Sequence, residues 1–163
     1  MTVIRSPIRY TSPKIIILAS SAVAVTHTGD TNETVLAPVT IPAGLMGLNG
    51  ALRVNHLWST PGGSGNNKSM RVRLGGVSGT AFAQQIHTTS LSYSDPGRLI
   101  QNRNSASSQV CRFVGNTGGA SSSAISTGSV NTAVAQDLVF TAQLASSGES
   151  ITLEQWMVEL ILP

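Results

Sequence analysis

The residues that could carry metal or acid–base chemistry are few and widely spaced. The three histidines, His27, His56 and His87, lie far apart in the sequence, and none has the short spacing to a second ligand that zinc motifs use. The seven carboxylates are dispersed too, whereas a catalytic carboxylate pair must share one wall of a cleft. We therefore expect no metal, no cofactor and no catalytic residue.

Two short motifs suggest ligand binding at first sight. The segment "HTGDTNE" (27–33) offers Asp30, Asn32 and Glu33 as calcium ligands, but it lacks the central glycine and terminal glutamate of EF-hand spacing. The glycine-rich "RLGGVSG" (73–79) lacks the lysine and the spacing of a phosphate-binding loop. We predict a solvated turn for the first motif and a hairpin loop for the second.

The segment "QNRNSASSQVCR" combines amide and guanidinium side chains in a stretch without a carboxylate. In an extended conformation Gln101 and Arg103 would point to one side, and Asn102 and Asn104 to the other. Neither side is apolar, so this cannot be an ordinary half-buried strand. We predict that these four residues lie at a subunit interface, where their donors meet backbone carbonyls of a neighbouring chain.

The charge of the chain gives little support to nucleic-acid binding. The formal net charge is +3 and the pI is about 9.6, mainly because carboxylates are few. A nucleic-acid face needs clustered Lys and Arg, and the ten basic residues here are scattered. We expect no nucleic-acid partner.

Composition and hydrophobic patterning predict an all-β fold. Charged residues make up only 10% of the 163 residues, against about 25% in typical proteins, which disfavours long helices with solvated faces. Short runs rich in Val, Ile, Leu and Thr alternate with Gly and Pro, as in strands and turns. We predict an antiparallel β-sandwich of the jelly-roll type.

The expected elements follow from alternation and from turn residues. The Asp-Pro-Gly sequence at 95–97 predicts a turn, and "SSGE" (146–149) predicts a β-hairpin between the last two strands. A polar, flexible segment is expected at 116–129. Strands are expected at 15–25, 34–44, 51–60, 69–76, 80–89, 137–145 and 150–162, with weaker ones at 98–103 and 108–115.

The same alternation predicts the core. The single cysteine, Cys111, cannot form an internal disulfide and is expected to be a small buried side chain. Arg71 and Arg73 are expected to point outward from the clearest half-buried strand. The expected inward residues are Val35, Ala37, Val39, Ile41, Leu52, Val54, His56, Trp58, Met70, Val72, Leu74, Phe82, Ile86, Phe113, Phe140 and Trp156.

The N-terminal residues "MTVIRSPIRYTSPK" are polar and cationic. Pro7 and Pro13 favour extended backbone and oppose a helix. Together with the apolar run "IIILASSAVAV" that follows, they also resemble a secretory signal, although the polar lead is unusually long for one. We interpret 1–14 as an extended arm and 15–163 as one β-sandwich domain. No apolar run reaches the about 20 residues of a membrane-spanning helix, so we expect no membrane partner.

Three segments, taken in order, resemble a β-rich module in virion proteins of tailed bacteriophages. They are "HTGDTNETVLAPVTIPAGLMGLNGALRV" (27–54), "NNKSMRVRLGG" (66–76) and "IQNRNSASSQ" (100–109). The resemblance covers roughly residues 27–162 and does not include the arm. It implies a structural role in the virion rather than a chemistry, as in capsid decoration or cement proteins, which are often trimers, or in spikes and fibres.

From this resemblance we expect a non-enzymatic capsid decoration protein, a homotrimer bound to the major capsid protein on the capsid exterior. The candidate capsid contacts are Arg5, Arg9, Tyr10 and Lys14 of the arm.

Two alternatives stay open. One is a tail-fibre or spike domain that binds a host-surface glycan, with Tyr93, Asn102 and Asn104 as candidate contacts. The other is a metal-dependent enzyme with a cupin-like site.

Overall fold

The computed structural model describes residues 14–61, 64–112 and 125–163. No helix in this part of the chain is long and apolar enough to cross a membrane. The described strands are β1 (Lys14–Ser21), β2 (Val25–Thr28), β3 (Thr34–Ile41), β4 (Ala51–Thr60), β5 (Lys68–Leu74), β6 (Thr80–His87), β7 (Leu91–Asn102), β8 (Gln109–Arg112), β9 (Ile125–Gly128), β10 (Gln136–Leu144) and β11 (Ser150–Leu162).

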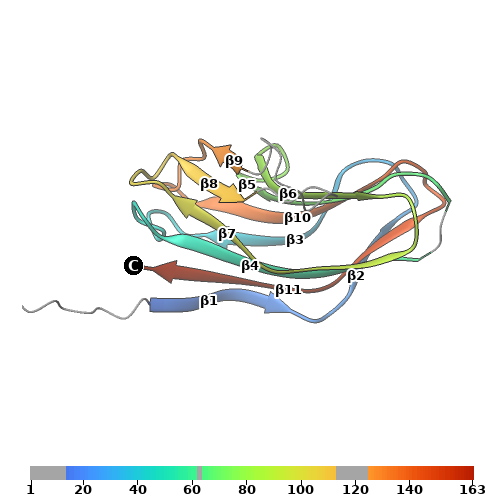
Figure 1. The fold of residues 1–163 in the computed structure, drawn as a ribbon, viewed down its shortest axis with the longest axis horizontal. Coiled ribbons are helices and arrows are strands. Elements are labelled where there is room, and N and C mark those ends of the chain that lie inside the picture. The colour runs from blue at the N-terminus through green and yellow to red at the C-terminus, as the bar shows by residue number, and fades with distance from the viewer. Residues whose placement is uncertain (1–13, 62–63, 113–124) are drawn as a thin grey trace, which may run out of the picture.

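The strands form two antiparallel sheets that pack face to face, as Figure 1 shows. The seven-stranded sheet has the order β1-β11-β4-β7-β8-β9, and β2 pairs with β11 beside β1; the four-stranded sheet has the order β3-β10-β5-β6. Early strands thus pair with late ones, β1 and β4 with β11, and β3 and β5 with β10. This wrapped order is that of a jelly roll, so the predicted β-sandwich is confirmed.

The core lies between the sheets and contains most of the predicted inward residues. Trp58, Phe82 and Phe140 are at most 1% exposed, and Cys111 is buried as predicted. Trp156 is half-buried and packs on Phe140, with ring centroids 5.5 Å apart. The remaining buried predicted residues are Ala37, Val39, Ile41, Leu52, Val54, His56, Met70, Val72 and Leu74. Phe113 lies outside the described residues.

Two segments that were predicted to be turns do not connect strands in the expected way. Residues 95–97 do not end a strand, because β7 continues through them as a register shift opposite Val54 and Asn55, with Gly97 at φ 142°. The last two strands are not a hairpin, because β10 pairs with β3 and β5 whereas β11 pairs with β1, β2 and β4. The connection 145–149 therefore passes from one sheet to the other.

Three smaller differences also come from local irregularities. The expected strand 15–25 is divided into β1 and the start of β2. Val35 is exposed rather than inward, because the pairing of β3 with β10 shifts register between Ala37 and Val35. The predicted flexible segment 116–129 contains β9, whose residues pair with β8; residues 116–124 lie outside the described part of the chain.

Candidate functional site

The predicted interface segment contains a side chain that is buried within its own fold. Asn102, at the end of β7, is 2% exposed. Its Nδ2 donates to the carbonyl oxygen of Gly47 at 2.7 Å and to Thr132 Oγ1 at 3.0 Å, and its Oδ1 accepts from Gln109 Nε2 at 2.9 Å. The Asn102 amide therefore links the segments that contain Gly47, Thr132 and Gln109 within one chain.

Gln109 completes this buried polar network. Its Nε2 donates to the carbonyl oxygen of Val130 at 3.0 Å, and its Oε1 accepts from the Val130 amide at 2.9 Å. Thr132 Oγ1 donates to the carbonyl oxygen of Ala106 at 2.8 Å. The network fixes the 103–108 loop against residues 130–132, because each buried polar group needs a partner.

The other three predicted interface residues are exposed. Gln101 Nε2 donates to the carbonyl oxygen of Asn49 at 3.4 Å, and the Asn104 backbone amide donates to Asn49 Oδ1 at 3.0 Å. The Arg103 side chain is also exposed. For Gln101, Arg103 and Asn104 the assignment to a subunit interface stays a prediction.

The edge of the seven-stranded sheet at β1 is unusually apolar. β1 pairs with β11 on one side, and no described strand pairs with its other side (Figure 1). Ile16 and Leu18 pack against the core, whereas Ile15 and Ile17 are 51% and 62% exposed on the outer face. Unpaired edges with apolar side chains favour pairing with another chain, and isolated proteins usually protect them.

The exposed isoleucines share the outer face of the sheet with further apolar side chains. Ile15 lies opposite Ile161 of β11, and Ile17 lies in a row that crosses β11 and β4 to reach Leu99 of β7, which is 42% exposed. We call Ile15, Ile17, Leu99 and Ile161 the β1 face. Gln101 belongs to the same outer face, in the row of Ile15 and Ile161.

An ion pair lies in the middle of the β1 face. Arg53 Nε donates to Glu159 Oε2 at 2.6 Å, and Arg53 Nη2 donates to Glu159 Oε1 at 3.1 Å. The hydrogen bonds from Arg53 lower the pKa of Glu159, and its positive charge adds to this effect against the opposing effect of burial. The carboxylate is thus held ionised, and the two opposite charges neutralise each other within the face.

Of the predicted capsid contacts, only Lys14 falls in the described part of the chain. It is the first residue of β1, where it lies opposite Leu162 with an exposed side chain. Arg5, Arg9 and Tyr10 lie outside the described residues. Lys14 therefore places the C-terminal end of the arm at the β1 edge.

The residues that could hold a metal are separated in space. Among the described residues no group of three or more His, Cys, Asp or Glu side chains converges. Of the suggested calcium ligands, Asp30 is exposed, whereas Glu33 points toward the four-stranded sheet and accepts two hydrogen bonds from Arg73, at 2.7 and 3.0 Å. Glu33 is therefore used in an ion pair, and the solvated-turn prediction holds for Asp30 and Asn32, which are both exposed.

The sequence reasoning missed the β1 face, although a signal for it was present. The run "IIIL" at 15–18 is apolar at every position, so an edge strand there must expose half of it. Tyr93, a candidate glycan contact, lies in β7 opposite Trp58, and its side chain is outside the described part of the structure.

No protein-family model and no curated protein sequence matches this chain. Among solved structures, one similar chain is the CBM2 module of the evolved Dit of Lactobacillus casei BL23 phage J-1, at 14% identity and a TM-score of 0.37, covering 77% of this chain and 69% of that one. Another is a chain of infectious bursal disease virus, Gx strain, at 13% identity and a TM-score of 0.32, covering 93% of this chain and 41% of that one.

A third similar chain comes from the VP2 subviral particle of infectious bursal disease virus, at 9% identity and a TM-score of 0.26. The chain spans less than half the length of both bursal disease virus chains, 41% in each case. All three chains come from viruses. With identities and TM-scores this low, the similarities assign neither a family nor a function.

Proposed function

We propose that the chain is a non-enzymatic virion structural protein, specifically a capsid decoration protein that forms a homotrimer on the outer capsid surface. The observation that carries the proposal is the β1 face, a set of exposed and partly exposed apolar side chains on the outer face of the sheet, next to an unpaired strand edge. Exposed apolar side chains beside an unpaired strand edge favour contact with another chain. The ordered motifs that resemble tailed-phage virion modules support the same role.

A second copy of this chain suits the β1 face because of its charge. The cation and the carboxylate in the face, Arg53 and Glu159, are paired with each other, so two copies would not meet with like charges opposed. Gln101 adds an exposed amide that both donates and accepts. Such a surface, neutral and mixed in donors and acceptors, can contact a symmetry-related copy of the same protein.

The strand edge and the arm suit the capsid partner. Backbone groups on the free side of β1 can pair with an extended segment of another protein, in the manner of strand addition. The arm ends at this edge with Lys14, and it supplies cations for capsid carboxylates; its candidate contacts are Arg5, Arg9, Tyr10 and Lys14. Each exposed ion pair contributes only about 0–1 kcal/mol, so repetition over three subunits supplies the affinity.

The oligomeric state tests the proposal that the chain forms a trimer through the β1 face. Light scattering after size-exclusion chromatography should give a trimer for the wild type and a smaller species for Ile17→Asp, with an unchanged circular dichroism spectrum. The matched control is Val77→Asp, because Val77 is 44% exposed in the turn between β5 and β6, away from the β1 face. A monomeric wild type, or a trimeric Ile17→Asp variant, would contradict the assembly through this face.

Deletion of residues 1–14 tests the proposal that the arm binds the capsid. The truncated protein should remain trimeric and folded, but should no longer sediment with capsid shells that lack the decoration. Full decoration by the truncated protein would overturn the role of the arm. A map of the decorated particle by electron cryo-microscopy would then distinguish a capsid position from a tail position.

A further inference from the structure

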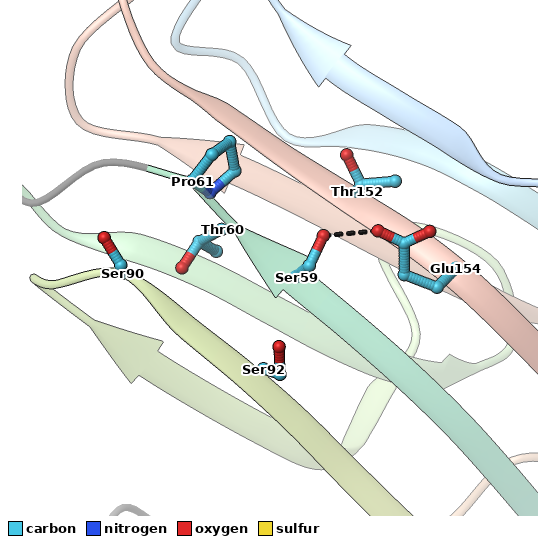
Figure 2. Close-up of a pocket in the computed structure, with 7 residues that line it drawn as sticks. All are labelled: Ser59, Thr60, Pro61, Ser90, Ser92, Thr152 and Glu154. Carbon is cyan, nitrogen blue, oxygen red and sulfur yellow. Dashed lines mark hydrogen bonds between the residues drawn. The ribbon is translucent and has the colours of Figure 1, made fainter.

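A second feature of the seven-stranded sheet, distinct from the β1 face, is a hollow over β4, β7 and β11 (Figure 2). Its volume is about 620 Å³, within the range of about 300–1,000 Å³ that ligand sites occupy. Six of its seven lining residues carry a hydroxyl or a carboxylate. The lining residues are Ser59, Thr60, Pro61, Ser90, Ser92, Thr152 and Glu154.

The carboxylate of the hollow lies at an irregularity in β11. Thr152 lies opposite Ser59 and Leu153 opposite Trp58, but the next paired residue is Gln155, so Glu154 is an extra residue in the strand. A bulge of this kind re-aims a side chain relative to regular alternation. Figure 2 shows the result, with Glu154 and Thr152 of β11 flanking Ser59 of β4.

The lining groups retain unused hydrogen-bonding capacity. Ser59 donates to Glu154 Oε1, and Thr152 Oγ1 is hydrogen-bonded to Thr26 Oγ1 at 2.8 Å. The half-buried Glu154 has no cation of the described residues within ion-pair distance, and its second oxygen remains open to a donor from a ligand. Ser92 directs a further hydroxyl into the same space.

This combination matches the chemistry of a neutral polyhydroxylated ligand. A carboxylate accepts from two neighbouring hydroxyl groups at once, and serine and threonine hydroxyls both donate and accept, as sugar hydroxyls do. Pro61 contributes an apolar edge against which the carbon face of a ring can pack. A cationic ligand would use the carboxylate but would leave the donating capacity of the hydroxyls unmatched.

We propose that this hollow is a binding site for a pyranose with adjacent free hydroxyls, with Glu154 as the residue that accepts from the diol. The site requires neither the trimer nor the capsid contact. It uses other residues than Asn102 and Asn104, which lie at the opposite end of β7 from Ser92.

The test is a titration of the isotope-labelled full chain followed by amide NMR. The probes are the methyl glycosides of glucose, galactose and mannose, with cis-1,2-cyclohexanediol and cyclohexanol as a matched pair that differ by one hydroxyl. At least one glycoside and the diol should shift the amides of Ser59, Ser92, Thr152 and Glu154, with a Kd of about 1 mM or weaker, as expected for an open site with few hydrogen bonds. Cyclohexanol should not shift these amides.

Two variants assign the effect to the carboxylate. Glu154→Gln retains the shape and the bond with Ser59 but should weaken glycoside binding about tenfold or more, since hydrogen bonds to an ionised acceptor are the stronger ones. The matched control is Asp137→Asn, because Asp137 likewise accepts from a threonine hydroxyl, Thr40 Oγ1 at 2.8 Å, but lines no part of the hollow. Asp137→Asn should bind as the wild type does.

Several results would overturn the proposal. They are the absence of glycoside-induced shifts in these amides at concentrations far above millimolar, equal binding of diol and cyclohexanol, or undiminished binding by Glu154→Gln. Saturable shifts of the same amides with Ca²⁺ alone would identify a cation site instead. A monomeric wild type in the assembly experiment would leave this result untouched, so the two proposals fail separately.

Discussion

Lys68 Nζ lies 2.7 Å from a carboxylate oxygen of Glu149, with both side chains enclosed at one end of the sandwich. The Lys68 side chain is 0% exposed and that of Glu149 is 10% exposed. Lys68 is the first residue of β5 in the smaller sheet, and Glu149 immediately precedes β11 in the larger one. The ion pair therefore links the two sheets, and Lys68 Nζ donates further to the carbonyl oxygen of Asn66 at 3.1 Å.

Removing one member of this pair should be strongly destabilising. Lys68→Met leaves the Glu149 carboxylate buried without a cation, and uncompensated buried charges cost about 3–5 kcal/mol. Denaturant unfolding followed by tryptophan fluorescence should show this loss in the free energy of unfolding. The double variant Lys68→Met/Glu149→Met should recover most of it, because no charge remains buried. Equal losses in the single and double variants would show that packing, not charge, is responsible.

Glu33 should make the protein less stable in acid. Burial raises the pKa of Glu33, but hydrogen bonds from Arg73 and Thr141 and the charges of Arg71 and Arg73 outweigh it, so the pKa is lowered overall. Thr141 Oγ1 donates to Glu33 Oε1 at 2.5 Å, and Arg71 Nη1 lies 3.3 Å from Oε2. A lowered folded-state pKa stabilises the fold above the unfolded pKa of about 4.3, and this stabilisation is lost as the pH falls through the folded value.

The Glu33→Gln variant isolates this contribution. At pH 7 it should be less stable than the wild type by about 1.5–3 kcal/mol, the range for hydrogen bonds to a charged group. The difference should shrink as the pH falls below the unfolded pKa of about 4.3 and then through the lower folded-state pKa of Glu33. Urea midpoints measured at a series of pH values check this. A difference that stays constant down to the most acidic pH would contradict the role of the ionised carboxylate.

Gly128 should not tolerate a side chain. It lies in β9 opposite Gln109, and a Cβ atom there would come within 2.5 Å of Cζ of Phe82, which is fully buried. Gly128→Ala should therefore lower the free energy of unfolding by about 1–3 kcal/mol, as other overpacked sites do. Gly148→Ala is the matched control, because nothing lies within 4 Å of the added atom, and it should change stability by less than about 0.5 kcal/mol. Similar values for the two variants would contradict the close contact at Phe82.

Local patterns in the sequence predicted the regular strands well. In β5, Met70, Val72 and Leu74 are buried and Arg71 and Arg73 point outward, because strict alternation leaves a single arrangement that hides the apolar side chains. The same reasoning placed Trp58 in the core. These elements need only period-two alternation and one buried face, and both are visible within about eight residues of sequence.

The irregular positions could not be predicted from local patterns. Glu154 lies where β11 gains one residue relative to β4, and a register shift is a property of the paired strand. "SSGE" has the composition of a hairpin turn, but composition does not determine whether the next strand joins the same sheet. Asn102 is buried because Thr132, 30 residues further along the chain, supplies its partner.

Asn102 and Arg103 are adjacent in sequence but should have separable effects. Asn102→Ala removes three hydrogen bonds within one chain, so it should lower the free energy of unfolding by about 1–3 kcal/mol, whether or not the protein is a trimer. Arg103→Ala alters an exposed side chain, so it should leave the unfolding of the dilute monomer within about 0.5 kcal/mol of the wild type while weakening trimer formation.

Denaturant unfolding and sedimentation velocity, each over a range of protein concentrations, measure the two effects independently. If the Arg103→Ala variant is fully trimeric and as stable as the wild type, Arg103 is not part of the subunit interface. A stability difference that arises from association depends on protein concentration, whereas one that arises within a single folded chain does not. An Asn102→Ala variant whose stability loss grows with protein concentration would therefore place the Asn102 amide in a contact between chains.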